Sequence, residues 1–277
     1  MIITVLNHTK TLADEDVQRV IRGINRQIRD DFEPYWSLGA TLRLEGRSTD
    51  KPGKIRLPDM RGDAVLYLWD DVDVDDALGY HYSNNAGIPF GFVFTELVKQ
   101  LDEEWSATLS HEALELIADP QVNLLVSGPH PADGHTVFHW YEMSDAVQAE
   151  TYECDGIQVS NFVLPLYFTP DAERGSRNDF LGRKHDGVTL QSFGINPGGY
   201  IGFFDPKLGK DVTYAHKGDK TAKRRLQAKK AQAVGRRTYR TGGYPREQAL
   251  AQRRSRSRDA SPPAVPPPHT EYEQIDE

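Results

Sequence analysis

The chain of 277 residues has few of the features that mark secreted or membrane proteins. Its single cysteine, Cys154, rules out a disulfide within the chain. No stretch approaches the roughly 20 apolar residues of a membrane span. Residues 1–10 contain no cationic segment followed by an apolar run of the signal-peptide type. These absences predict a soluble, cytoplasmic protein that has no membrane partner.

Basic residues are missing from a long part of the chain. Between Lys99 and Arg174 there is no lysine or arginine, whereas the same interval holds 14 Asp or Glu residues and four His. An ordinary exposed helix usually carries basic residues that pair with acids one turn away. Carboxylates clustered beside histidines cost Coulomb energy unless a cation, a proton or open solvent offsets it. We therefore expect a cation site in this interval.

Residues 105–120, WSATLSHEALELIADP, predict a helix with two different faces. One face is apolar, and the opposite arc carries His111, Glu112, Glu115 and Asp119. His111 and Glu115 are one turn apart and can reach one cation, while Glu112 lies where a water-activating carboxylate is needed. This HExxE pattern differs at one residue from the HExxH helix of zinc peptidases. The alternative is a polar helix face that is simply solvated.

A catalytic metal site needs a third protein ligand, which can come from a distant part of the sequence. Glu142 and Asp145 are the best candidates, because they lie in the same interval and would share a face if their segment were helical. For each residue, a surface position is the alternative. His81 is a candidate for contact with the substrate, and a structural histidine is the alternative there.

The order of elements predicts an α/β (α+β) fold. Apolar runs at residues 2–6 and 64–69 predict buried strands, and the alternation at residues 41–45 predicts a half-exposed strand. A helix is expected to begin at Asp14 and to end at Pro34. We expect one domain over residues 1–205 and a disordered tail over residues 206–277.

The predicted tail differs sharply in charge from the rest of the chain. Residues 1–206 hold 33 acidic residues against 16 basic ones, whereas residues 207–258 hold 3 against 17. Low apolar content favours disorder, because burial cannot offset the loss of chain entropy. The basic segment 207–258 is a candidate for binding nucleic acid or another polyanion. Loose association with the acidic body and a purely solubilising role are the alternatives.

Several segments resemble a bacterial and phage zincin-like metallopeptidase family with an HExxE helix. The resemblance covers roughly residues 2–205 and rests on VLNHT (5–9), ALGYH (77–81), SHEALELIADP (110–120), EMSDAV (142–147) and VSNFVLPLYF (159–168). It implies a zincin-like core, with a mixed twisted sheet, a backing helix and an active-site helix. It further implies metal ligation by His111 and Glu115, with Glu112 activating water, and Glu142 and Asp145 resemble the later ligand and its supporting aspartate.

Two functions follow from these patterns. The first is a metal-dependent hydrolase, most simply a peptidase acting on peptides or proteins, with zinc as the expected metal. Manganese, iron or calcium also suits one histidine with several carboxylates. The second is a non-catalytic zincin-like binding or assembly protein that uses its basic tail. Glu112 beside His111 favours the first function, and Glu115 in place of a second histidine favours the second.

Overall fold

The computed structural model describes residues 1–45, 62–70, 79–83, 89–170, 176–223 and 272–274. These residues form two compact units. Unit 1 takes Met1–Val122 and Glu150–Asn161, and unit 2 takes Asn123–Ala149 and the described residues from Phe162 onward. Each unit is built around its own β-sheet, so each is described by itself.

Unit 1 contains a five-stranded mixed sheet in the order β2-β1-β3-β5-β4. Strands β2, β1, β3 and β5 run parallel, and β4 is antiparallel to β5. The three strands predicted from sequence are confirmed, and the central one is buried along its whole length. The bounds are β1 Ile2–Asn7, β2 Thr41–Glu45, β3 Ala64–Trp69, β4 Gly79–Ser83 and β5 Pro89–Phe94.

The first helical segment begins at Asp14 as predicted, but it does not end at Pro34. Helix α1 (Asp14–Gln27) continues into a π-helical turn, η1 (Ile28–Phe32), and then into α2 (Glu33–Trp36). Pro34 lies in the first turn of α2, at the junction with the π-helical turn, and the helical path continues past it. The helical path ends instead at Ser37, which adopts a left-handed conformation with φ of 53°.

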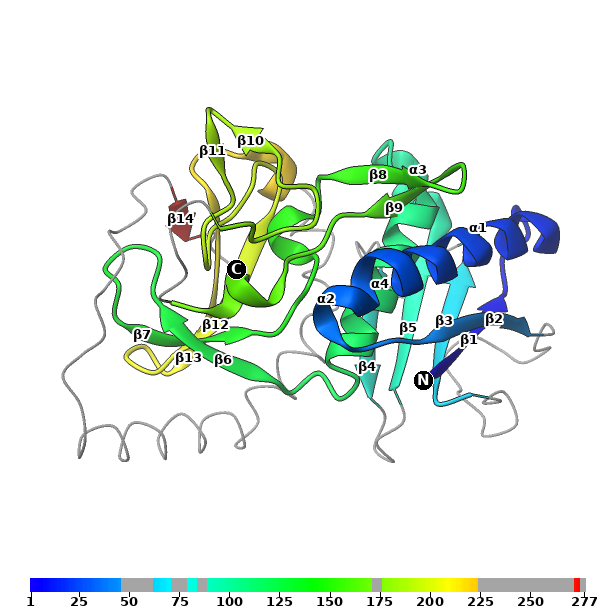
Figure 1. The fold of residues 1–277 in the computed structure, drawn as a ribbon, viewed down its shortest axis with the longest axis horizontal. Helices are drawn as coiled ribbons and strands as arrows, with labels where there is room; N and C mark the ends of the chain where they lie inside the picture. Colours follow the sequence, from blue (N-terminus) through cyan, green and yellow to red (C-terminus); the bar gives the residue numbers. More distant parts are fainter. Residues whose placement is uncertain (46–61, 71–78, 84–88, 171–175, 224–271, 275–277) are drawn as a thin grey trace. The chain divides into compact units, whose positions relative to one another are not determined.

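The helix predicted over residues 105–120 is confirmed as α4 (Trp105–Ala118), preceded by the short helix α3 (Thr95–Gln100). Helix α4 packs against β4, β5 and the hairpin strand β9 (Ile157–Ser160). Strand β8 (Thr151–Cys154) pairs with β9, and both strands lie alongside α1, as Figure 1 shows.

A closed ring of hydrogen bonds joins α4 to α1 and β9. Ser110 Oγ donates to Gln27 Oε1 at 2.6 Å and accepts from the Ser160 amide at 3.1 Å. Gln27 Nε2 completes the ring by donating to the Ser160 carbonyl at 2.8 Å. All three residues are buried, so water cannot replace a lost bond. Because Ser110 directly precedes His111, this ring holds α4 in place next to the candidate metal ligands.

Replacing Ser110 by alanine should lower the free energy of unfolding by about 1–3 kcal/mol, because it leaves a buried carbonyl oxygen and a buried amide without their partner. Urea denaturation measures the change. Ser192→Ala is the matched control, since the Ser192 hydroxyl makes one exposed bond to the Leu166 carbonyl. Equal effects of the two substitutions would contradict a structural role for the ring.

Unit 2 contains a second five-stranded sheet, in the order β14-β13-β12-β7-β6, in which every neighbouring pair is antiparallel. Aromatic side chains, including Phe138, Trp140 and Phe204, form part of its core. The bounds are β6 Leu125–Pro129, β7 Thr136–Trp140, β12 Tyr200–Asp205, β13 Lys210–His216 and β14 Tyr272–Gln274. Smaller elements are η3 Asp145–Val147, η4 Pro165–Phe168, β10 Lys184–His185 and β11 Val188–Thr189.

The sheet of unit 2 continues past residue 205, where the sequence predicts the end of the folded domain. Strand β13 pairs with β12 through residues such as Phe203 and Val212, and residues 211–215 are buried. The expected boundary therefore falls at the turn of a β-hairpin. The change in charge begins in this hairpin because its turn and its strand ends carry lysines, while the middle of β13 is apolar or uncharged. The predicted disorder of residues 224–271 lies outside the described residues.

The described residues establish a mixed α/β architecture of the α+β kind, with separate mixed and antiparallel sheets. Among these residues, none of the helices combines the length and apolar character that crossing a bilayer requires.

Candidate functional site

The three predicted active residues of α4 are buried. The exposed fraction is 7% for His111, 1% for Glu112 and 0% for Glu115. Asp119, just beyond the helix, is buried as well. The alternative of a solvated polar face is therefore wrong. Charged groups are rarely buried unless they are paired, protonated or bound to a metal.

His111 and Glu115 lie close enough to act together. His111 Nε2 is 3.1 Å from Glu115 Oε1, as expected for side chains one helical turn apart. This is hydrogen-bond distance, and the same two atoms can bind one cation after a small side-chain adjustment. Glu112 lies next in sequence to His111 on the same helix. The pattern HExxE thus gives a buried donor pair with a second buried carboxylate beside it.

Glu142 and Asp145 do not lie on one α-helix, so the face that they would share in a helix does not exist. Glu142 follows β7, and Asp145 begins the short 3-10 helix η3. Neither residue is a surface acid, because their exposed fractions are 8% and 5%. Both line one small pocket of unit 2. Other residues of its lining include His139, Tyr167 and Tyr200.

The predicted ligand set is divided between the two units. His111 and Glu115 belong to unit 1, whereas Glu142 and Asp145 belong to unit 2. His81 lies on β4 of unit 1, where it pairs with Gly91 of β5. The side chain of His81 lies outside the described part of the chain, so its predicted contact with substrate stays a prediction.

His139 is a buried residue of the pocket that the sequence did not single out. Burial lowers the pKa of His139 to about 4, so the ring is neutral at physiological pH. Its Nε2 lies 3.0 Å from the Pro129 carbonyl oxygen, to which a neutral ring donates. The remaining nitrogen, Nδ1, is then an acceptor.

A second group of possible metal ligands, in the loop between β6 and β7, was also missed. It consists of His130, Asp133 and His135, in the sequence HPADGH. Burial, together with the nearby His135, lowers the pKa of His130 below its ordinary value. Although partial burial opposes it, hydrogen bonding from His135 lowers the pKa of Asp133 to about 2. The spacing of two histidines around an aspartate is the sequence signal that could have found this group.

The described part of the predicted basic segment forms ion pairs within unit 2. Lys207 Nζ lies 3.4 Å from Asp133 Oδ2, and Lys223 Nζ lies 2.7 Å from Glu273 Oε1. These pairs are at least partly exposed to solvent, so each contributes little to stability. Residues 224–258, which hold all the arginines of this basic segment, lie outside the described residues.

Comparisons with protein-family models, with curated proteins and with solved structures find no match to this chain. The functional argument therefore rests on the residues and their geometry.

Proposed function

We propose that this chain is a metal-dependent hydrolase of peptides or proteins, and that unit 1 is a zincin-like core. The observation that carries the proposal is the buried donor pair of α4. His111 Nε2 and Glu115 Oε1 are 3.1 Å apart, and the buried Glu112 adjoins them in sequence. A buried imidazole with two buried carboxylates on one helical turn costs folding energy unless it serves a cation or another strong partner.

The arrangement of unit 1 supports the zincin-like interpretation. Its mixed sheet has one antiparallel edge strand, β4, and helix α4 packs against β4 and β5. The sheet and helix α1 correspond to the sheet and backing helix that the family resemblance implies. Hydrogen bonds between Ser110, Gln27 and Ser160 hold α4 in place next to the proposed ligands.

The donor set fits a divalent cation. His111 and Glu115 supply nitrogen and oxygen donors, and a third ligand, for which the sequence predicts Glu142 or Asp145, would complete the set. Zinc is the proposed metal because it accepts imidazole and carboxylate ligands. A carboxylate in place of a second imidazole adds negative charge, so Mn²⁺, Fe²⁺ and Ca²⁺ also suit the set. The same charge makes a bound ion a weaker Lewis acid.

In the proposed reaction, the residues of α4 have different roles. A divalent cation supplies Lewis acidity toward the scissile carbonyl and lowers the pKa of water. His111 and Glu115 hold the cation in a fixed position. Glu112 accepts a proton from the attacking water and passes it to the leaving amine. Their burial excludes bulk water, which strengthens the electrostatic interactions between these groups.

Replacing Glu115 by histidine tests the ligand assignment, because it creates the HExxH pattern. We expect Glu115→His to raise the affinity of the full chain for Zn²⁺ by about tenfold or more, measured by isothermal titration calorimetry. Glu104→His is the matched control, because Glu104 is exposed and directly precedes α4. Unchanged zinc affinity in Glu115→His would remove position 115 from the metal site.

The alternative function is a non-catalytic zincin-like binding protein that uses its basic segment. Glu115 is the feature that favours it, since a second histidine is the usual ligand at that position. The alternative would gain support if the chain bound zinc at α4 but hydrolysed no member of a peptide library. Salt-dependent binding of single-stranded DNA would then assign polyanion binding to the segment 207–258.

A further inference from the structure

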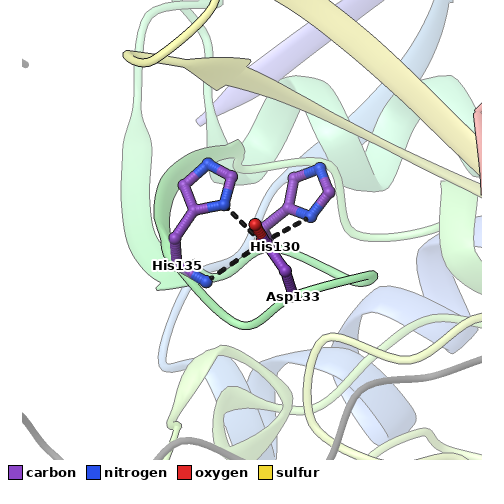
Figure 2. A group of neighbouring side chains, drawn as sticks. All are labelled: His130, Asp133 and His135. Atoms are coloured by element: carbon purple, nitrogen blue, oxygen red, sulfur yellow. Dashed lines mark hydrogen bonds and ion pairs between the residues drawn. The ribbon is translucent and has the colours of Figure 1, made fainter.

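The loop between β6 and β7 gathers three possible metal ligands within unit 2. Figure 2 shows His130, Asp133 and His135 with their side chains directed toward one another. One ligand atom from each residue lies within 4.8 Å of the others. The group shares no residue with the site proposed on α4.

The two imidazoles converge on a single carboxylate oxygen. His130 Nδ1 is 3.1 Å from Asp133 Oδ1, and His135 Nδ1 contacts the same oxygen. Figure 2 shows both contacts as dashed lines. Two nitrogens and one oxygen directed at a common region are the donor types that first-row transition cations select.

The rings are held by packing. The His130 and His135 rings stack with centroids 4.5 Å apart. The rings of Phe203 and Tyr214 meet the His130 ring edge to face, at 5.3 and 5.2 Å. The side chains of His130 and His135 are only 10% and 16% exposed. Ligands that are already ordered lose little conformational entropy when they bind a metal.

A buried aspartate orients His135 from the opposite side. His135 Nε2 lies 3.2 Å from Asp205 Oδ1, and Asp205 is only 2% exposed. The Lys207 amide donates to the same oxygen at 2.7 Å. A metal that replaced the proton shared by His135 Nδ1 and Asp133 would leave Nε2 donating to Asp205 and Nδ1 bound to the metal. This is the carboxylate–histidine–metal arrangement of many zinc sites.

The strand register explains why Asp205 is available there. Strands β7 and β12 are antiparallel, with Phe138 opposite Phe204. The end of β12 therefore lies beside the start of β7, where His135 precedes Thr136. The turns β6–β7 and β12–β13 meet at this edge of the sheet, so residues 70 positions apart in sequence form one group.

The hydrogen bond to His130 provides a second indication of a cation. The Ala132 amide donates to His130 Nδ1 at 3.1 Å, so this nitrogen carries no proton in that arrangement. The same nitrogen then faces Asp133 Oδ1, another acceptor, at 3.1 Å. Two acceptors at this distance repel each other. A cation that took the Nδ1 lone pair in place of the Ala132 N–H, and also bound Asp133 Oδ1, would relieve the repulsion.

We propose that His130, Asp133 and His135 bind a divalent first-row transition cation, Zn²⁺ above the others, with Asp205 as the positioning residue. Three protein ligands leave a fourth position open for water or another ligand. The ion would join the two turns at this edge of the unit 2 sheet. Lys207 contacts Asp133 through the other carboxylate oxygen, Oδ2, and this exposed pair is too weak to prevent metal binding.

Zinc titration of the full chain tests the proposal. Asp133→Ala should weaken zinc binding at this site about 100-fold or more, and His111→Ala should leave it intact. Asp133 is exposed, so the substitution should preserve the fold, which circular dichroism verifies. Glu153→Ala, at another exposed carboxylate, is the matched control. The same zinc stoichiometry and affinity in Asp133→Ala and wild type would overturn the proposal.

The positioning role of Asp205 has its own readout. Asp205→Asn should weaken zinc binding about 10- to 100-fold and shift the visible absorption bands of the Co²⁺-substituted protein. A purely structural role would lower stability without changing either property of the folded protein. His135→Ala, with His185→Ala as its control, should abolish the Co²⁺ bands of this site. Bands that persist in His135→Ala would exclude His135 as a ligand.

Discussion

Replacing Glu112 by glutamine should lower kcat/KM for the proposed peptide hydrolysis by about 10²- to 10⁴-fold, the usual contribution of a general base. Glutamine has nearly the same size as glutamate but cannot accept the proton of the attacking water. Because Glu112 is only 1% exposed, the isosteric glutamine keeps the buried volume at this position. The measurement is the steady-state rate of the metal-loaded full chain on the best substrate of a peptide library.

One control variant and one zinc titration make this result specific. Glu104→Gln carries the same substitution at an exposed position and should keep full activity. Zinc titration of Glu112→Gln should show unchanged stoichiometry, because Glu112 is not a proposed ligand. Wild-type activity in Glu112→Gln would show that another group accepts the proton, and the mechanism would be wrong.

Replacing Gly199 by alanine should lower the free energy of unfolding by about 3 kcal/mol. A Cβ at this position would lie 2.3 Å from the Ala146 carbonyl oxygen and 3.0 Å from that of Asp145. These neighbours are backbone atoms, so no side chain can rotate away. The Asn196 amide also donates to the Ala146 oxygen, at 2.9 Å, so the clash disturbs a bonded turn. Urea denaturation measures the loss.

The matched control is Gly209→Ala in the β12–β13 turn. A Cβ there meets no atom within 4 Å, so the cost comes only from its φ of +67° and should be about 1 kcal/mol. A Gly199→Ala variant that is as stable as Gly209→Ala would show that the backbone around η3 shifts easily. Because η3 begins with Asp145, that result would also weaken the case for a fixed Asp145 carboxylate.

The elements predicted correctly from sequence are those with strong local patterns. Helix α4 and strands β1, β2 and β3 have clear apolar periodicity or continuous apolar runs, which local chain geometry determines. The burial of Glu112 and Glu115 could not be predicted in this way. A polar arc on a helix looks the same in sequence whether solvent or other parts of the protein cover it.

The antiparallel sheet of unit 2 was mostly missed for a different reason. Its pairing joins distant segments, such as Phe138 with Phe204, and no local pattern encodes that register. The lysines around strand β13 predict that it belongs to the tail. Its middle residues are nevertheless buried. No local pattern in HPADGH predicts the meeting of His135 with Asp205, because it depends on the same long-range register.

The metal content of the full chain tests the central claim most directly. Elemental analysis after loading with Zn²⁺ and removing excess ion should give about two equivalents for wild type. His111→Ala and Asp133→Ala should each lose one equivalent, and the double variant should lose both. If only the site of His130, Asp133 and His135 fails to bind zinc, the wild type should hold about one equivalent, and His111→Ala should lose it. If His111→Ala holds as much zinc as the wild type, α4 is not a metal site and the proposed hydrolase is contradicted.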